Sequence, residues 1–93
     1  MVMTAVKTAV RIRDLGWDDD AALYLLQPQL VTEGVATHHV IVTALTPAEK
    51  GHGSVVFAAT ADGRVTSWAY LHRSHSADHA EVLAELGYRA GAT

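Results

Sequence analysis

The sequence predicts an α+β fold in which an antiparallel sheet of four to five strands carries one C-terminal helix packed on one face. Three patterns support this prediction. Polar and apolar residues alternate over residues 6–13, an Asp62-Gly63 pair separates two apolar stretches, and apolar residues at helical spacing follow Ser76. Ninety-three residues suffice for one hydrophobic core but not for two, so residues 1–93 are expected to form a single domain.

The first expected strand runs from Val6 to Ile12. Its faces are Val6, Thr8, Val10 and Ile12 on one side, and Lys7, Ala9, Arg11 and Arg13 on the other. This period of two is typical of a half-buried strand. The basic residues are interpreted as protection of an edge strand against foreign strands. Residues 14–20 then form a loop, because Gly16 and the aspartates favour turns.

Residues 21–31 fit two structures. Asp19 or Asp20 would cap a short helix ending at Leu26, whereas a strand is supported by Tyr24, Leu25, Leu30 and Val31. Proline cannot donate to a sheet ladder, so a strand here lies at an edge or is irregular at Pro28. We favour the strand.

Residues 35–45 are largely apolar on both faces. This pattern predicts a central strand that is covered on both sides. Residues 54–61 and 64–71 then flank Asp62-Gly63, the strongest hairpin signal in the chain. A two-residue loop would pair Phe57 with Trp68 and Val55 with Tyr70, and a longer loop would shift that pairing.

The final element is a helix capped by Ser76, with Asp78 in its first turn. Its apolar stripe consists of His79, Val82, Leu83 and Leu86. Gly87 ends the helix, and Tyr88 is expected to fold back toward Leu83 in a Schellman cap.

One helix covers one face of the sheet, so the second face needs another cover. Either the sheet curls on itself, or the N-terminal strand and the Pro28 region fold across it. Alternatively, another protein covers it, and a two-fold homodimer is the commonest form of such an assembly.

Composition narrows the function. The chain has no cysteine, which excludes disulfides and thiolate metal ligands. A net charge of −3 argues against nucleic-acid binding. No export signal or membrane-spanning apolar run is found, so a cytoplasmic protein with no membrane partner is expected. Abundant alanine and valine predict a high-GC genome.

Two sets of residues are candidate sites. Trp17, followed by Asp18, Asp19 and Asp20, lies in the expected loop and is the candidate partner-binding site. His72, His75 and His79 have a spacing that would bring imidazoles together as metal ligands. No fourth ligand is evident and Arg73 opposes a cation, so solvated loop histidines and a half-buried His79 are the favoured interpretation.

Four segments together resemble small uncharacterised proteins of actinobacteria and their phages: residues 23–31, 39–43, 56–63 and 78–88. The resemblance implies no activity, cofactor or catalytic residue. It favours the strand over residues 23–31.

The first functional hypothesis is a non-enzymatic accessory protein that binds another protein, either a second copy or a cellular or host protein, without a cofactor. No phosphate loop, nucleophile elbow or paired carboxylate motif is present. The alternatives are a histidine-dependent metal-binding protein or small hydrolase or nuclease, and a structural homodimer.

Overall fold

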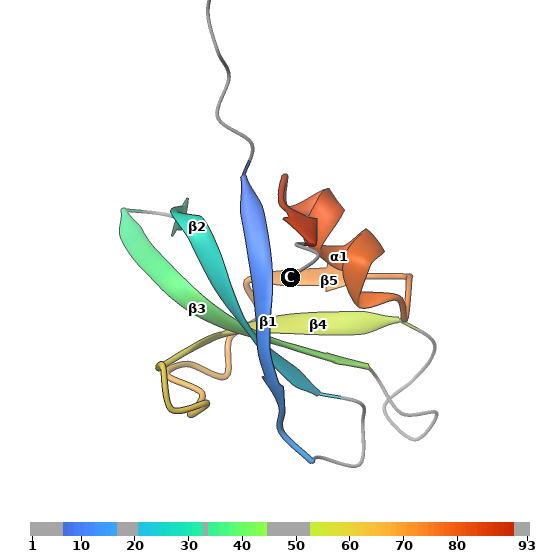
Figure 1. Cartoon of the computed structure of the whole chain (residues 1–93), viewed down its shortest axis with the longest axis horizontal. Helices are drawn as coiled ribbons and strands as arrows, with labels where there is room; N and C mark the ends of the chain where they lie inside the picture. The colour runs from blue at the N-terminus through green and yellow to red at the C-terminus, as the bar shows by residue number, and fades with distance from the viewer. Residues whose placement is uncertain (1–6, 17–20, 33, 45–52, 91–93) are drawn as a thin grey trace, which may run out of the picture.

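The computed structural model describes residues 7–16, 21–32, 34–44 and 53–90 (Figure 1). Trp17, Asp18, Asp19 and Asp20 therefore lie outside the described residues. The elements in chain order are β1 (Thr8–Asp14), β2 (Ala22–Thr32), β3 (Val35–Ala44), β4 (Ser54–Ala59), β5 (His72–Ser74), α1 (His79–Glu85) and β6 (Arg89–Ala90).

The strands form a six-stranded sheet in the order β5-β4-β3-β2-β1-β6. It curls into a half-barrel with α1 on its inner side (Figure 1). The predicted α+β class with one C-terminal helix is confirmed, but the prediction of four to five antiparallel strands is wrong. The additional strand, β6, pairs in parallel with β1 through Thr8↔Arg89 and Ala9↔Ala90. A strand of two residues is too short to produce an alternating pattern, so the sequence held no signal for it.

Residues 22–31, part of the stretch that fitted either a helix or a strand, belong to the strand β2, as predicted. It pairs with β1 and β3, and the pairing with β3 is irregular between Leu25 and Leu30. This irregularity surrounds Pro28, whose preceding peptide bond is cis. The missing proline N–H explains why the ladder is interrupted there. The Tyr88 hydroxyl donates a hydrogen bond of 2.6 Å to the Pro28 carbonyl.

The predicted hairpin partner over residues 64–71 is not a strand. An isolated bridge joins Ala59 to Val65, and regular pairing resumes only in β5, where Val56 lies opposite His72. Thr66 and Leu71 still donate main-chain hydrogen bonds to Ala58 and Val56, and residues 67–70 leave the ladder between them; we call the whole stretch the 66–71 segment. The Ser67 hydroxyl accepts the Ala69 N–H at 3.3 Å, a local contact that turns the chain away from the sheet.

Phe57, Trp68 and Tyr70 form the expected aromatic group, although the strand register that was predicted to bring them together is absent. The ring of Phe57 meets Trp68 and Tyr70 edge to face, with centroids 5.1 and 5.4 Å apart. These geometries are favourable for aromatic pairs. Side-chain packing therefore preserves the contact although the predicted cross-strand pairs Phe57–Trp68 and Val55–Tyr70 are absent.

The helix begins at Asp78 rather than Ser76. Asp78 is the N-cap and accepts the Ala80 N–H at 3.0 Å, while the Ser76 hydroxyl accepts the N–H of Asp78 itself. The predicted Schellman end is confirmed. The Tyr88 N–H donates to the Leu83 carbonyl and the Gly87 N–H to that of Ala84, both at 2.9 Å.

The centre of β3 is covered on both faces, as predicted: Val40, Ile41 and Val42 are fully buried. The main core lies under α1 and comprises Ala9, Ala22, Tyr24, Leu26, Val40, Val42, Val56, Val82, Leu83 and Tyr88. A smaller core on the other side comprises Ala21, Leu23 and Ile41, covered by Leu15, Ala59 and Val65. The chain itself therefore covers this face, through the residues around Leu15 and Val65 rather than through the Pro28 region.

Candidate functional site

A groove lies beside the first half of β3, where β4 stops. The last pair between the two strands is His39 with Ala59, although β3 begins at Val35. We call the resulting hollow the β3 groove. It has a volume of about 440 Å³ and is lined by Thr32, Val35, Thr37, Ala58, Thr66, Ser67, Ala69, Tyr70 and Leu71. A shallower hollow of about 260 Å³ continues it along residues 35–39.

The main chain of β3 is open along this groove. Val56 and Ala58 accept hydrogen bonds from Leu71 and Thr66, so their main-chain groups face away from β3. Main-chain direction alternates along an antiparallel strand, so the groups of Ala59 face His39. The alternation shifts at His38, where the pairing of β3 with β2 is irregular. Only two residues separate Thr32 from Val35, and the residues that flank a two-residue hairpin loop form a hydrogen-bonded pair, so the main-chain groups of Val35 and Thr37 face β2 and those of Ala36 face the groove. Within the described part of the chain, no strand pairs with β3 at these positions.

Exposed apolar side chains surround the open edge. The exposed fractions are 63% for Val35, 56% for Tyr70 and 69% for Trp68. Val35 and Tyr70 line the groove, and the rings of Trp68 and Tyr70 both pack on Phe57. Such grouped apolar exposure marks interaction surfaces in soluble proteins.

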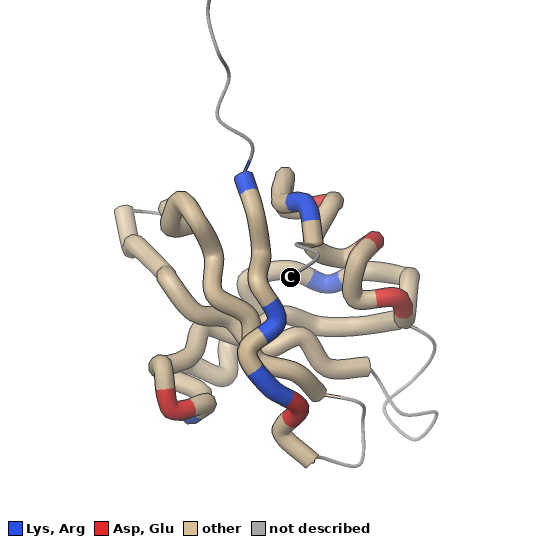
Figure 2. Tube along the Cα trace, in the orientation of Figure 1, with Lys and Arg blue, Asp and Glu red and all other residues tan. Residues whose placement is uncertain are grey.

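The strands around the groove carry no Asp, Glu, Lys or Arg side chain. Residues 22–32, 35–44 and 54–59 contain no Asp, Glu, Lys or Arg, and Figure 2 shows β2, β3 and β4 without a charged position. The polar side chains that line the groove carry hydroxyl groups and include Thr37, Thr66 and Tyr70. The groove is therefore suited to uncharged segments.

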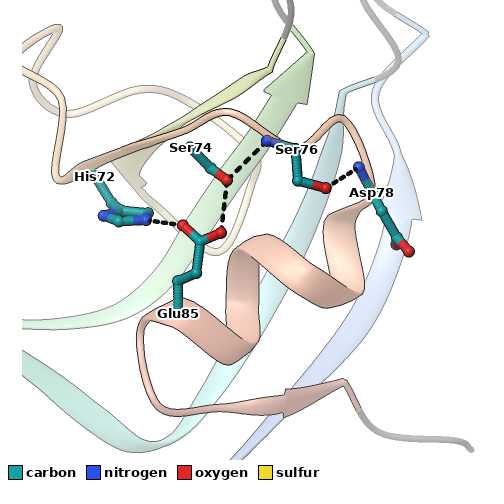
Figure 3. Close-up of polar contacts among 5 residues, drawn as sticks. All are labelled: His72, Ser74, Ser76, Asp78 and Glu85. Atoms are coloured by element: carbon teal, nitrogen blue, oxygen red, sulfur yellow. Dashed lines mark hydrogen bonds and ion pairs between the residues drawn. The ribbon is translucent and has the colours of Figure 1, made fainter.

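A second polar cluster joins α1 to β5 (Figure 3). The Glu85 carboxylate lies 2.6 Å from His72 Nε2 and accepts the Ser74 hydroxyl proton at 2.8 Å. The Ser74 oxygen in turn accepts the Ser76 N–H at 3.0 Å. The hydrogen bonds from His72 and Ser74 lower the pKa of the Glu85 carboxyl below its ordinary value. The cluster fastens the last turn of the helix to the sheet.

These residues resemble a hydrolase triad in composition but not in arrangement. Where a serine acts as the nucleophile, a histidine imidazole accepts the serine hydroxyl proton and a carboxylate orients that imidazole. Here the imidazole of His72 and the hydroxyl of Ser74 both bond to Glu85. Ser74 is also buried, with 3% of its surface exposed. The contacts therefore support a structural role for the cluster.

The three candidate metal ligands lie in different surroundings. His72 bonds to Glu85, His75 is exposed in the turn before the helix, and His79 is buried with its Nδ1 3.0 Å from the Tyr24 hydroxyl. Among residues 7–16, 21–32, 34–44 and 53–90, no three His, Cys, Asp or Glu side chains are placed to hold a metal ion. The placement of His79 follows from the helical stripe, which points it into the core.

Sequence reasoning did not identify the β3 groove. Its components are spread over three parts of the chain, and the predicted hairpin placed residues 66–71 in the sheet rather than beside it. One signal was available: the stretch from Ala21 to Ala44 contains a single charged residue, Glu33. No helix in the described residues is long and apolar enough to cross a membrane.

No protein-family model, curated protein or solved structure matches this chain. The resemblance to proteins of actinobacteria and their phages stays a prediction.

Proposed function

We propose that this protein is a protein-binding module that receives an extended segment of another polypeptide as an additional strand beside β3. The open edge in the β3 groove is the observation that supports this function. A bound strand would satisfy the main-chain groups of Ala36 and would cover exposed apolar surface at Val35 and Tyr70.

The energetics suit such binding. Each main-chain hydrogen bond contributes about 0.5–1.5 kcal/mol net, and burying apolar side chains contributes about 25 cal/mol per Å². The edge is part of a sheet whose neighbouring residues Val40, Ile41 and Val42 are fully buried, so little conformational entropy is lost on binding. The uncharged groove predicts segments with apolar or hydroxyl side chains at alternate positions.

The test is selection of random twelve-residue peptides, displayed on phage, against the protein immobilised at low density. Recovered peptides are then measured against Val35→Lys and Val31→Lys. The two valines have nearly equal exposure, 63% and 60%, and lie on paired strands, but only Val35 lines the groove. The expected result is at least tenfold weaker binding to Val35→Lys, because a charged side chain at the edge opposes strand addition. Val31→Lys is expected to bind as the wild type does.

Amide exchange checks the mode of binding. The Ala36 N–H group is expected to become protected when a selected peptide binds, whereas those of Val35 and Thr37, which face β2, should change little. Peptides that bind both lysine variants equally well and leave the Ala36 amide unprotected would refute the proposal.

A further inference from the structure

We infer that the strand received by β3 is the β3 of a second copy of this chain, so that two sheets join across a two-fold axis at Ala36. This inference rests on the proposed function, since it names the occupant of the same edge. It is supported by the absence of edge protection, by a self-complementary register, by charge and by the exposed area.

The other open stretches of strand in the described residues each carry a feature that discourages pairing. Beyond its two pairs with β6, β1 presents Arg11 and Arg13. Beyond Gln27, where its pairing with β1 ends, β2 contains Pro28. The outermost strands, β5 and β6, have three and two residues. Short length, basic residues and proline are the usual means by which sheet edges avoid association.

Residues 35–38 of β3 have none of these features. Their sequence is Val-Ala-Thr-His, without Lys, Arg, Asp, Glu or Pro. An unprotected apolar edge that stays open is an aggregation hazard. A specific partner that covers it removes the hazard, and a second copy is always present where the protein is.

The edge matches itself in register. Ala36 directs its main-chain groups outward, whereas Val35 and Thr37 direct theirs toward β2. Antiparallel strands alternate between hydrogen-bonded and non-hydrogen-bonded pairs. With a two-fold axis at Ala36, Ala36 of each copy forms a hydrogen-bonded pair with Ala36 of the other. Val35 of each copy then lies opposite Thr37 of the other in a non-hydrogen-bonded pair, and the Ala36 pair exchanges two main-chain hydrogen bonds.

Charge permits this symmetry. A two-fold axis brings each residue near its own copy, so a charged edge would repel itself. The protein has a net charge of −3, but β2, β3 and β4 carry no Asp, Glu, Lys or Arg (Figure 2). The two His38 side chains would lie on opposite sides of the axis, about 13 Å apart along the strands.

The exposed area is of the size that a dimer needs. An aromatic side chain buries about 150–250 Å², so the exposed fractions of 69% for Trp68 and 56% for Tyr70 leave roughly 300 Å² per copy. Two copies then contribute about 600 Å² of the roughly 1,000 Å² expected of a specific interface. Further exposed surface around the edge is provided by Thr32, Val35, Ala36, Thr66, Ser67 and Ala69.

The decisive experiment introduces a single cysteine into this cysteine-free chain. In Ala36→Cys, the two Cα atoms across the axis would lie about 5.5 Å apart, within the range that a disulfide spans. Oxidation at low protein concentration is expected to produce a covalent dimer. His38→Cys is the matched control, because it is also exposed on the same edge but its copies are too far apart to bond.

The mass of the protein is measured in parallel by light scattering over a dilution series. Wild type and Val31→Lys are expected to be dimers, and Val35→Lys is expected to dissociate at least tenfold more readily. A wild-type monomer, or a dimer unaffected by Val35→Lys that does not cross-link through Ala36→Cys, overturns the inference. A monomer that still binds selected peptides through Val35 leaves the proposed function standing, whereas a monomer without such peptides refutes both.

Discussion

Substitution of Gly53 by alanine tests a close approach between the chain before β4 and the end of β5. Gly53 precedes β4 and has a φ of 130°, a conformation that other residues rarely adopt. A Cβ atom at this position would lie 2.1 Å from the Ser74 carbonyl oxygen and 3.1 Å from the His75 Cα. Both contacts are with main chain, so no flexible side chain can move aside, and the pairing of β4 with β5 must shift.

The loss of unfolding free energy in Gly53→Ala has two parts, a conformational cost and a steric clash. A second variant, Gly87→Ala, measures the conformational cost alone. Gly87 has a φ of 91°, and a Cβ atom there would have no neighbouring atom within 4 Å, so Gly87→Ala bears only the conformational cost, about 1–2 kcal/mol. Gly53→Ala bears that cost and the clash, for which main-chain displacement in a packed region adds about 2 kcal/mol or more. We therefore expect Gly53→Ala to lose at least about 3 kcal/mol of unfolding free energy.

The assay is urea unfolding at pH 7 followed by tryptophan fluorescence, with thermal unfolding as a second measure. For a domain of this size, each kcal/mol corresponds to about 4–8 °C in Tm. Gly53→Ala should therefore melt well below Gly87→Ala. Equal stabilities of the two variants would show that Gly53 does not approach the end of β5 as closely as described.

Three further predictions concern the helix and its surroundings. Leu83→Ala should lower the unfolding free energy by about 2–5 kcal/mol, since Leu83 is fully buried; a loss below about 1 kcal/mol in urea unfolding would contradict its place in the core. In the wild type, the lowered pKa of Glu85 makes its bonds with His72 stabilising above the ordinary glutamate pKa of about 4.3, and this stability is lost as the pH falls further. The difference in urea midpoint between wild type and Glu85→Gln should therefore shrink between pH 7 and pH 3, and a constant difference would exclude the carboxylate as its source. Tyr88→Phe removes the hydrogen bond to Pro28 and should cost about 1 kcal/mol by thermal unfolding, so an unchanged Tm would show that this bond is not formed in solution.

The open edge in the β3 groove differs from the other open strand edges because it lacks the features that prevent strand association. Arginines, proline and short length protect the other open stretches, whereas residues 35–38 are unprotected and adjoin exposed aromatic rings. Both the proposed function and the inferred dimer depend on this one edge. The peptide, cross-linking and mass measurements separate them.

The predicted histidine cluster shows how local spacing can mislead. The spacing of His72, His75 and His79 was compatible with a shared site, but the N-cap at Asp78 sets the helix phase that turns His79 toward Tyr24. Glu85, which the sequence did not single out, became the partner of His72 because the helix returns along β5. Contacts between residues far apart in the chain decided which polar groups meet.

The elements whose signals are local could be predicted from the amino-acid sequence. Alternation predicted β1, two apolar faces predicted the buried centre of β3, and the stripe with Gly87 predicted α1 and its Schellman end. The parallel pairing of β6, the departure of residues 67–70 from the sheet and the open edge beside Val35 emerged only in the folded chain. Periodicity and capping depend on neighbours within a few residues, whereas strand pairing and its termination depend on which distant segments compete for the same edge.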